Sequence, residues 1–273
     1  MRFGPFAFTQ DTFPIIAGPC VIESEEHVLK MAQQLAQARD RLGLQLIFKT
    51  SFDKANRSSL TSFRGLSLEE SLPIFRRIKE TTNLPLLTDV HTPDQPARLA
   101  AVVDVIQIPA FLCRQTDLLV AAARTGRTVN VKKGQFLSPW EVGNIVAKLK
   151  HAGCESFAIT ERGTSFGYNN LVTDMRAIPI MQDLGVPVIF DATHSAQLPG
   201  GDGATTGGRR ETITAVARAA VAAGCDGLFI EVHDNPDQAL SDSATQWPLD
   251  KFDGLVTGLL AIRKTYVELG IHD

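Results

Sequence analysis

The chain has 273 residues, of which 44% are hydrophobic, enough for one sizeable core and suited to a single barrel of about 250 residues. A formal net charge of −3 argues against a nucleic-acid binder, because the binding surface of such a protein is basic. The four cysteines lack the spacing of zinc knuckles or disulfide frameworks, and no signal peptide or long apolar span is evident, so we expect a cytoplasmic protein.

Short apolar runs alternate with helix-like stretches along the chain. The apolar runs predict buried parallel strands at residues 15–17, 44–49, 84–88, 103–108, 128–131, 156–160, 186–190 and 227–230. Helices are expected at residues 27–41, 67–79, 94–101, 116–126, 139–152, 173–184, 210–223 and 250–269. This alternation favours a (β/α)₈ TIM barrel over an open doubly wound sheet. We expect one catalytic barrel domain over residues 1–273, with residues 1–13 as a short N-terminal cap or hairpin.

Three helix starts carry explicit capping signals. Ser24, followed by two glutamates, is expected to open the first helix. Thr116 or Asp117 is expected to cap the fourth helix, and Ser138 the fifth, where a proline follows at the first helical position. No Gly-x-Gly-x-x-Gly follows the first strand, so the sequence does not support a dinucleotide site.

The loop at residues 49–59 is unusually rich in hydrogen-bond donors, with two lysines, an arginine, an asparagine and three serines. A solvated basic loop would have a similar composition. However, a reactive or ionisable residue recurs at the carboxyl end of each predicted strand. These residues are Cys20, Lys49, Asp89, Gln107, Lys132, Arg162, His194 and Glu231. In a barrel these ends surround one mouth, where active sites lie, so the pattern predicts an active site.

Five cations are expected to converge on that mouth: Lys49, Lys54, Arg57, Lys132 and Arg162. Such a cluster would repel itself unless anions bind there. Arginine forks and lysine ammonium groups match phosphates and carboxylates. The cluster therefore predicts a ligand set with at least two anionic groups.

A second group of residues suits a metal ion. Cys20, His194 and Glu231 end strands one, seven and eight, which barrel closure makes neighbours. Asp242, in the loop after strand eight, is a candidate fourth ligand. A mixed set of sulfur, nitrogen and oxygen donors suits a divalent transition metal such as Zn²⁺ or Fe²⁺. Taken singly, each residue is also compatible with a structural role, for example a buried thiol or a carboxylate paired with a lysine.

Several motifs carry a resemblance that extends over nearly the whole chain. They are Ala17-Gly18-Pro19-Cys20, Lys54-Ala55-Asn56-Arg57-Ser58-Ser59, Thr88-Asp89-Val90-His91, Gln107-Ile108-Pro109-Ala110-Phe111-Leu112-Cys113-Arg114-Gln115, Val131-Lys132-Lys133-Gly134, Thr160-Glu161-Arg162-Gly163, Ala192-Thr193-His194-Ser195 and Gly207-Gly208-Arg209-Arg210. With these motifs the chain resembles the 3-deoxy-D-manno-octulosonate 8-phosphate synthase family. The resemblance implies a transferase that condenses phosphoenolpyruvate with D-arabinose 5-phosphate and water and releases phosphate, for lipopolysaccharide biosynthesis.

The resemblance also implies residue roles. Phosphoenolpyruvate would be bound by Lys54, Lys132 and Arg162, with Lys49 near its reacting end. Asn56, Arg57 and Ser58 would hold the sugar phosphate, with Asp89 and Gln107 nearby. The remaining substrate-binding candidates are Ala110 and Arg114. The catalytic candidates are Lys49, Lys54, Asn56, His194 and Asp242.

Further expectations concern the metal and the assembly. Cysteine at position 20, together with Asp242-Ser243-Ala244-Thr245-Gln246, is similar to the metal-dependent branch, whereas the other branch has asparagine in place of this cysteine. The ion would be Zn, Fe, Mn or Co. The family is usually a homotetramer, and an exposed Phe111 beside Arg114 suits a subunit contact, so we expect Arg114 to reach a neighbouring chain's site. Residues 197–204 do not match the family closely.

Three alternatives remain open on the sequence. A heptulosonate 7-phosphate synthase that uses erythrose 4-phosphate would share the barrel, but its family carries Lys-Pro-Arg-Thr-Ser where this chain has Lys54-Ala55-Asn56-Arg57-Ser58-Ser59. A Schiff-base aldolase would use Lys132 or Lys49 as an uncharged nucleophile. A barrel that only binds sugar phosphates would have the same cations. The sequence does not decide which of His194 and the carboxylates acts as the general base.

Overall fold

The computed structural model describes residues 1–56, 59–202 and 205–270. Eight parallel strands form a closed barrel, because β11 pairs with β14 as well as with β8. Around the barrel the strands are β3 (Ile15–Gly18), β4 (Leu46–Lys49), β5 (Leu86–Asp89), β6 (Val105–Ile108), β7 (Thr128–Lys132), β8 (Phe157–Glu161), β11 (Val188–Asp191) and β14 (Gly227–His233). The predicted TIM barrel is confirmed, and every predicted strand lies within two residues of an observed one at its start.

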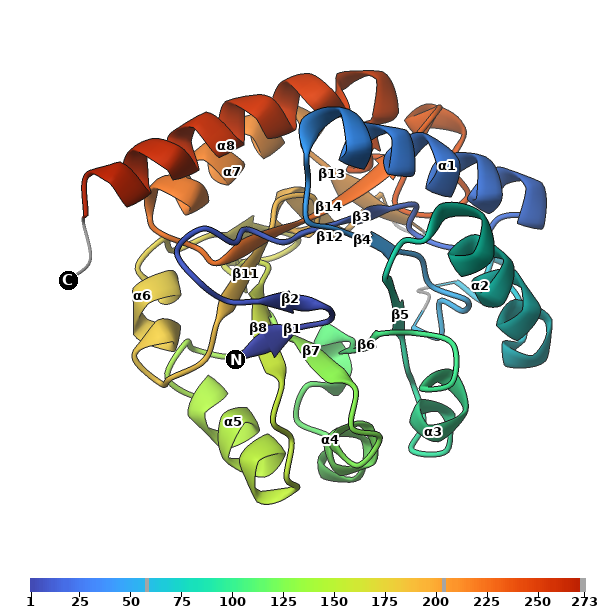
Figure 1. The fold of residues 1–273 in the computed structure, drawn as a ribbon, viewed down its shortest axis with the longest axis horizontal. Coiled ribbons are helices and arrows are strands. Elements are labelled where there is room, and N and C mark those ends of the chain that lie inside the picture. Colours follow the sequence, from blue (N-terminus) through green and yellow to red (C-terminus); the bar gives the residue numbers. More distant parts are fainter. Residues whose placement is uncertain (57–58, 203–204, 271–273) are drawn as a thin grey trace.

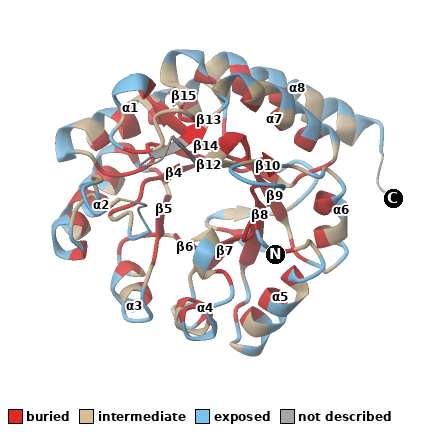
Figure 2. Ribbon diagram, turned by 180° about the vertical axis from the view of Figure 1, so that it is seen from behind, coloured by how far each residue is buried: buried red, intermediate tan, exposed pale blue. Residues whose placement is uncertain are grey.

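The helices surround the barrel on its outside (Figure 1). They are α1 (Glu25–Leu42), α2 (Leu68–Thr82), α3 (Gln95–Leu99), α4 (Thr116–Ala123), α5 (Val142–His151), α6 (Ala177–Gln182), α7 (Ile213–Ala222) and α8 (Phe252–Glu268). Their inner faces are buried and their outer faces exposed (Figure 2). No helix in the described part of the chain is both long and apolar enough to span a membrane.

Further strands and 3₁₀ turns lie outside the barrel strands and the surrounding helices. The short strands are β1 (Arg2–Phe3), β2 (Phe6–Ala7), β9 (Thr164–Ser165), β10 (Leu171–Val172), β12 (Gln197–Asp202), β13 (Thr205–Gly208) and β15 (Trp247–Pro248). The 3₁₀ turns are η1 (Ala110–Leu112), η2 (His194–Ala196), η3 (Arg210–Thr212), η4 (Pro236–Gln238) and η5 (Leu249–Lys251).

The helix starts show which capping signals are reliable. Ser24 caps α1 as expected, since its side chain accepts a hydrogen bond from the backbone N–H of His27. The expectation for α4 is wrong, because Gln115 occupies the N-cap position without a side-chain bond. The helix expected after Ser138 also begins later than predicted, at Val142. The hydroxyl and backbone N–H of Ser138 donate to Glu141, and the intervening residues form a turn before α5.

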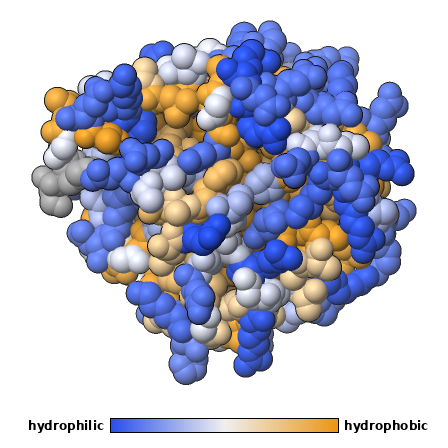
Figure 3. All heavy atoms as spheres, in the orientation of Figure 1, coloured by the Kyte–Doolittle hydropathy of each residue, from blue (hydrophilic) through white to orange (hydrophobic). Residues whose placement is uncertain are grey.

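The N-terminal hairpin β1–β2 closes the amino end of the barrel, as predicted for the cap (Figure 1). Phe3 is fully buried and belongs to a barrel-interior cluster. The cluster contains Phe3, Ile16, Ile47, Leu87, Val105, Ala158, Ile189 and Phe229. The backbone N–H of Gly4 donates to the hydroxyl of Thr128 at the start of β7, 3.1 Å away. Around the hairpin, the surface is a mixture of hydrophilic and hydrophobic side chains (Figure 3). With this end closed, ligands have access only from the opposite end.

Gly18 allows β3 and β4 to lie close together at that open end. A Cβ atom at this position would be 2.0 Å from the carbonyl oxygen of Lys49. No side chain fits at such a distance, so glycine is required between the strand and Cys20. This close approach places Cys20 and Lys49 beside each other at the mouth.

Candidate active site

A cavity of about 420 Å³ opens at the carboxyl ends of the barrel strands. Seven of the eight predicted strand-end residues line it: Lys49, Asp89, Gln107, Lys132, Arg162, His194 and Glu231. Lys54, Asn56, Ala110 and Asp242 line it as well. Cys20 is fully buried beside the cavity, where its thiol lies 3.3 Å from a carboxylate oxygen of Asp242. Arg57 and Ser58 lie outside the described residues.

The lysines of the cavity are paired with buried carboxylates. Lys49 forms an ion pair with Glu231, and Lys132 forms one with Asp191. Lys54 lies 3.8 Å from Asp89. The expectation that bound anions alone would relieve the repulsion among these cations is therefore wrong, because carboxylates of the chain already do much of this.

Arg162 differs from the three lysines. Its side chain is buried and donates a 2.6 Å hydrogen bond to the amide oxygen of Gln197. Another guanidinium nitrogen, Nη1, is buried without a hydrogen-bond partner. Burial lowers the pKa of Arg162, although neighbouring carboxylates, Asp191 first among them, oppose this. A buried and unsatisfied donor costs free energy, so an anion in the cavity would gain from binding there.

Lys132 is a lysine of the site whose pKa is lowered. Burial lowers its pKa to about 8, although Asp191 acts in the opposite direction. Its ammonium group lies over the ring of Phe229, 3.1 Å from the ring centre. The ring contact and the ion pair hold the side chain pointing into the cavity.

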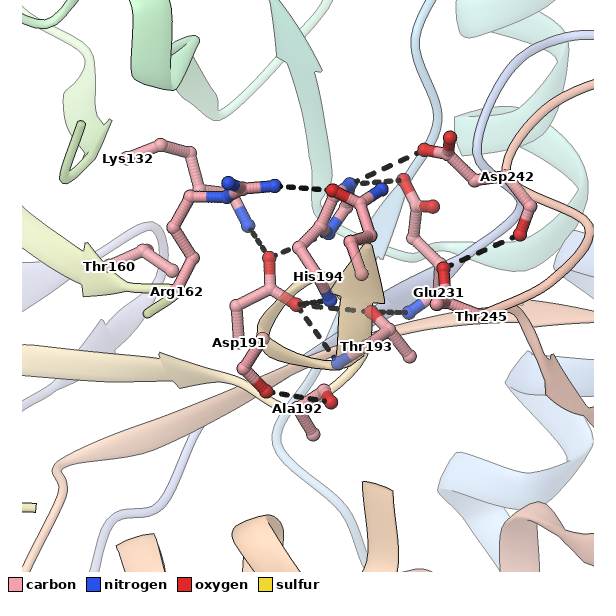
Figure 4. A network of polar contacts seen from close by, with 12 residues as sticks. Lys132, Thr160, Arg162, Asp191, Ala192, Thr193, His194, Glu231, Asp242 and Thr245 are labelled. Carbon is pink, nitrogen blue, oxygen red and sulfur yellow. Dashed lines mark hydrogen bonds and ion pairs between the residues drawn. The ribbon is translucent and has the colours of Figure 1, made fainter. Parts of the chain in front are cut away.

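Asp191, at the end of β11, organises this part of the site (Figure 4). One carboxylate oxygen lies 2.7 Å from Nδ1 of His194 and also pairs with Lys132. The other accepts hydrogen bonds from the hydroxyl and backbone N–H of Thr193 and from the backbone N–H of His194, at 2.8–3.1 Å. Burial acts to raise the pKa of Asp191, but the charges of His194 and Lys132 outweigh it and hold that pKa well below its usual range.

The sequence interpretation gave Asp191 no role, although the strand-end pattern would have found it. It is the last residue of its strand, whereas the predicted strand-end residue, His194, lies three positions later. Because Asp191 holds Nδ1, the Nε2 atom of His194 points toward Glu231 and Asp242, at 3.7 and 3.6 Å. The pKa of His194 is raised, since Asp191 and Glu231 outweigh the effect of burial.

A hydrogen-bonded chain of polar side chains crosses the barrel beneath the cavity. Thr160 donates to Asn130, which donates to Gln107, at 2.7 and 2.8 Å, and Gln107 donates to Asp89. Ser51 donates to the other oxygen of Asp89 at 2.5 Å. Burial acts to raise the pKa of Asp89, but nearby lysines outweigh it and keep that pKa well below its usual range. These hydrogen bonds from Gln107 and Ser51 hold the carboxylate of Asp89 in place as a charged acceptor that lines the cavity.

The predicted metal ligands meet at the opposite side of the cavity. Ligand atoms of Cys20, Glu231 and Asp242 lie within 4.8 Å of one another, and Nε2 of His194 faces both carboxylates. One carboxylate oxygen of Glu231 is buried without a hydrogen-bond partner. Burial and the neighbouring carboxylates raise the pKa of the Cys20 thiol, so a thiolate there needs a cation beside it. This donor set fits a divalent transition metal.

The loop after β14 is held in an uncommon conformation at Asp242, the predicted fourth ligand. Asp242 has a φ of 49°, in the left-handed region that non-glycine residues seldom adopt. Its carbonyl oxygen accepts hydrogen bonds from the backbone N–H groups of Thr245 and Gln246, at 3.0 and 3.1 Å. The side-chain oxygen of Gln246 accepts a 3.3 Å bond from the backbone N–H of Cys20. Backbone strain of this kind concentrates at functional sites.

Arg114 does not join the cavity of its own chain. It is exposed, and its carbonyl oxygen accepts a 3.0 Å hydrogen bond from Lys148. Phe111, three residues earlier, lines the cavity yet is 54% exposed. The position of Arg114 is compatible with a contact to a second chain, but not with binding a ligand in its own cavity.

Replacing Asp191 with asparagine is expected to lower both metal affinity and kcat/KM by about 10- to 100-fold, since a carboxylate that orients a ligating histidine contributes on that scale. Asparagine keeps the size of the side chain but removes the charge that fixes His194. Metal affinity can be measured by competition with a chromophoric chelator. The matched control is Asp183→Asn, on an exposed residue. Unchanged affinity and kinetics in Asp191→Asn would show that the network is only structural.

Comparison with known proteins places this geometry in a family. The model of the "DAHP synthetase I family" matches residues 7–262. A 2-dehydro-3-deoxyphosphooctonate aldolase of Cyanothece sp. (strain PCC 7425 / ATCC 29141) is 58% identical over 251 residues, which cover 92% of each chain. The protein of the same name from Brucella ovis is 58% identical over 247 residues, which cover 90% of this chain and 89% of the relative. The chain therefore belongs to the DAHP synthetase I family, among its 2-dehydro-3-deoxyphosphooctonate aldolases.

Proposed function

We propose that the protein condenses phosphoenolpyruvate with D-arabinose 5-phosphate and water to give 3-deoxy-D-manno-octulosonate 8-phosphate and inorganic phosphate. This product is 2-dehydro-3-deoxyphosphooctonate under another systematic name, the compound for which the relatives are named. The observation that carries the proposal is the cavity itself, which Lys132, Glu231 and Asp242 line together with Arg162, one of whose guanidinium nitrogens is unsatisfied. The product would enter lipopolysaccharide biosynthesis.

In this proposal Lys54, Lys132 and Arg162 bind the phosphate and carboxylate of phosphoenolpyruvate. Lys49 lies near its reacting end, fixed by Glu231 and by a 2.9 Å hydrogen bond to the carbonyl oxygen of Cys20. The three lysines are held by carboxylate partners, and Arg162 by Gln197, before a substrate arrives. Preorganised charges are worth more than mobile ones, because little reorganisation is needed during the reaction.

The sugar phosphate would bind on the other side of the cavity. Asn56, Asp89, Gln107 and Ala110 line that space. Asp89 is a charged acceptor for a sugar hydroxyl, since the charges of Lys54 and Lys49 outweigh burial and keep the pKa of Asp89 low. We extend the proposal to Arg57 and Ser58, outside the described residues, as ligands of the sugar phosphate, because an arginine fork and a hydroxyl match its oxygens.

The reaction makes one carbon–carbon bond and, from water, one carbon–oxygen bond, and it breaks the carbon–oxygen bond to the phosphate. C3 of phosphoenolpyruvate attacks the aldehyde carbon, water adds at C2, and the phosphate then leaves from C2. The proton lost by the water balances the proton gained by the former aldehyde oxygen. The candidates to hold and pass that proton are His194 and Asp242, whose side chains lie 3.6 Å apart. With a metal ion bound to Nε2 of His194, the carboxylate of Asp242 would remain as the group able to accept the proton. Holding both substrates at reacting distance contributes further.

Cys20, His194, Glu231 and Asp242 would hold a divalent Zn, Fe, Mn or Co ion. When bound, the ion would polarise an aldehyde or water oxygen without changing its oxidation state. The donor set and the unsatisfied oxygen of Glu231 support this metal-dependent assignment.

We infer a cytoplasmic enzyme, because all four cysteines are free and buried and the proposed substrates are phosphorylated metabolites. A Schiff-base mechanism fits less well, since Lys49 and Lys132 each form an ion pair with a buried carboxylate, which an uncharged nucleophilic lysine would leave without its partner. The proposed reaction is tested by mass spectrometry of the product of arabinose 5-phosphate and phosphoenolpyruvate. An eight-carbon keto-acid phosphate is expected, and recovery of the unchanged substrates would reject the proposal.

A homotetramer would complete the site with Arg114 from a neighbouring chain. Arg114→Ala is expected to raise KM for arabinose 5-phosphate by about tenfold or more, since a charge-assisted contact is worth about 1.5–3 kcal/mol, and to leave the thermal midpoint unchanged. Mixing this variant with inactive Lys132→Met should restore part of the activity if subunits exchange. Arg124→Ala, at another exposed arginine, is the control. Wild-type kinetics in Arg114→Ala would exclude the contact.

A further inference from the structure

A second group of ligand-type side chains lies at the same end of the barrel, outside the cavity. It joins Glu23, in the loop after β3, His27 on α1 and His233 at the end of β14. One ligand atom from each lies within 4.8 Å of the other two. None of the three belongs to the lining of the proposed active site.

The two imidazoles are arranged as metal ligands usually are. Nδ1 of His27 is buried and makes no hydrogen bond, and Nε2 of His233 lies 3.3 Å from a carboxylate oxygen of Glu23. His233 is only 3% exposed. An unsatisfied buried nitrogen is costly, so Nδ1 of His27 calls for a partner, which an ion shared with Glu23 and His233 would supply.

The remaining ring nitrogens share another carboxylate. Nε2 of His27 and Nδ1 of His233 lie 3.1 and 3.2 Å from the same oxygen of Asp234. The other oxygen of Asp234 is bound by the ammonium of Lys30 at 2.6 Å. A carboxylate behind two imidazoles fixes ring orientation and increases ligand basicity, which is the usual support for histidine ligands.

We propose that Glu23, His27 and His233 form a second binding site for a divalent transition-metal ion, separate from the one at Cys20. Two imidazoles and one carboxylate suit Zn²⁺ or Co²⁺, with water in the remaining positions. In the metal-free protein the backbone N–H of Asn235 donates to Nδ1 of His233, so Nε2 carries the proton. Metal binding moves this proton to Nδ1, toward Asp234, or releases it.

Such an ion would stabilise the loop that carries the fourth ligand of the first site. Glu23 accepts a 2.9 Å hydrogen bond from the backbone N–H of Leu240, two residues before Asp242. The proposed ion would tie this loop to α1 and to β14. We therefore assign it a structural role and expect binding to raise the thermal midpoint of the protein.

The test is a Co²⁺ titration of chelator-treated full-length protein, with bound metal measured by equilibrium dialysis. Wild type is expected to bind two ions per chain, one of them with the near-ultraviolet absorption of a cobalt–thiolate bond. His27→Gln and Glu23→Gln should each bind one ion and retain that absorption. His151→Gln, at an exposed histidine, is the control and should bind two.

The titration distinguishes an incorrect assignment at Cys20 from an incorrect assignment of the second site. If only the site at Cys20 is wrong, wild type binds one ion without thiolate absorption and His27→Gln binds none. If the second site is wrong, wild type binds one ion with thiolate absorption, or both variants bind as much Co²⁺ as wild type. Circular dichroism spectra establish that the variants are folded, and Glu23→Gln keeps an acceptor for the backbone N–H of Leu240.

Discussion

Lys132→Met is expected to lower kcat/KM for phosphoenolpyruvate by about 100- to 1,000-fold, the usual loss when a preorganised charged donor is removed from an active site. Methionine occupies a similar volume over Phe229 but carries no charge to hold an anion. The loss also leaves Asp191 with His194 as its remaining ionic partner. Steady-state kinetics with both substrates measure the effect, and Lys150→Met, on the exposed face of α5, is the control. A loss of less than about threefold would remove Lys132 from the site.

The pH dependence of kcat/KM tests the charge of Lys132. Because burial lowers the pKa of Lys132 to about 8, its charged fraction falls as pH rises through that value. Since the charged form binds phosphoenolpyruvate, kcat/KM should fall above pH 8, up to about tenfold per pH unit. In Lys132→Arg this fall should move to higher pH, because a guanidinium stays charged. An identical fall in both proteins would assign the titration to another group.

Removing the metal is expected to abolish turnover almost completely, by about 100-fold or more, since polarisation by a divalent ion contributes several kcal/mol. Several ions should restore activity, because the proposed task is polarisation without redox change. The thiolate of Cys20 should favour transition metals over Mg²⁺. His194→Ala should lose both metal and activity. Protein that is shown to be metal-free and yet fully active would contradict the proposed metal site.

Cys20→Asn separates metal binding from turnover. An amide cannot replace a thiolate as a ligand, but it can donate a hydrogen bond to the same water or aldehyde oxygen. We expect weaker metal binding together with residual activity that chelators do not remove. Cys154→Ser, at another buried cysteine, controls for the loss of a thiol. Metal affinity equal to that of wild type would mean that Cys20 is a packing residue.

The sequence predicts the barrel and the position of its mouth well, because both follow from local patterns. Apolar runs identify the strands, and the residue after each run is forced to the same end of a parallel barrel. It predicts the pairing of side chains poorly. That Lys49 binds Glu231, 182 positions away, depends on the closure of the barrel and on side-chain reach, which no local pattern carries. That the carboxylate of Asp191 pairs with Lys132, 59 positions away, depends on the same closure, whereas the place of Asp191 at a strand end follows from the local pattern.

Adjacent residues of the same type can also have different environments, which the sequence pattern does not predict. Lys132 and Lys133 are adjacent, and strand alternation sends them to different sides of the barrel wall. Lys133 is fully buried outside the cavity, where it lies 3.6 Å from Glu161 and donates to the carbonyl oxygen of Leu137. The sequence pattern did not predict the group at Glu23, His27 and His233 for a related reason, since His233 lies more than 200 positions from the other two residues.

The most direct test of the proposed function is phosphate release from phosphoenolpyruvate with either arabinose 5-phosphate or erythrose 4-phosphate, each with and without a chelator. We predict rapid release with arabinose 5-phosphate, little with erythrose 4-phosphate, and loss of the former on chelation with recovery when Mn²⁺ or Co²⁺ is added. Preference for erythrose 4-phosphate would make the protein a heptulosonate 7-phosphate synthase, and binding of both substrates without phosphate release would contradict the enzymatic assignment altogether.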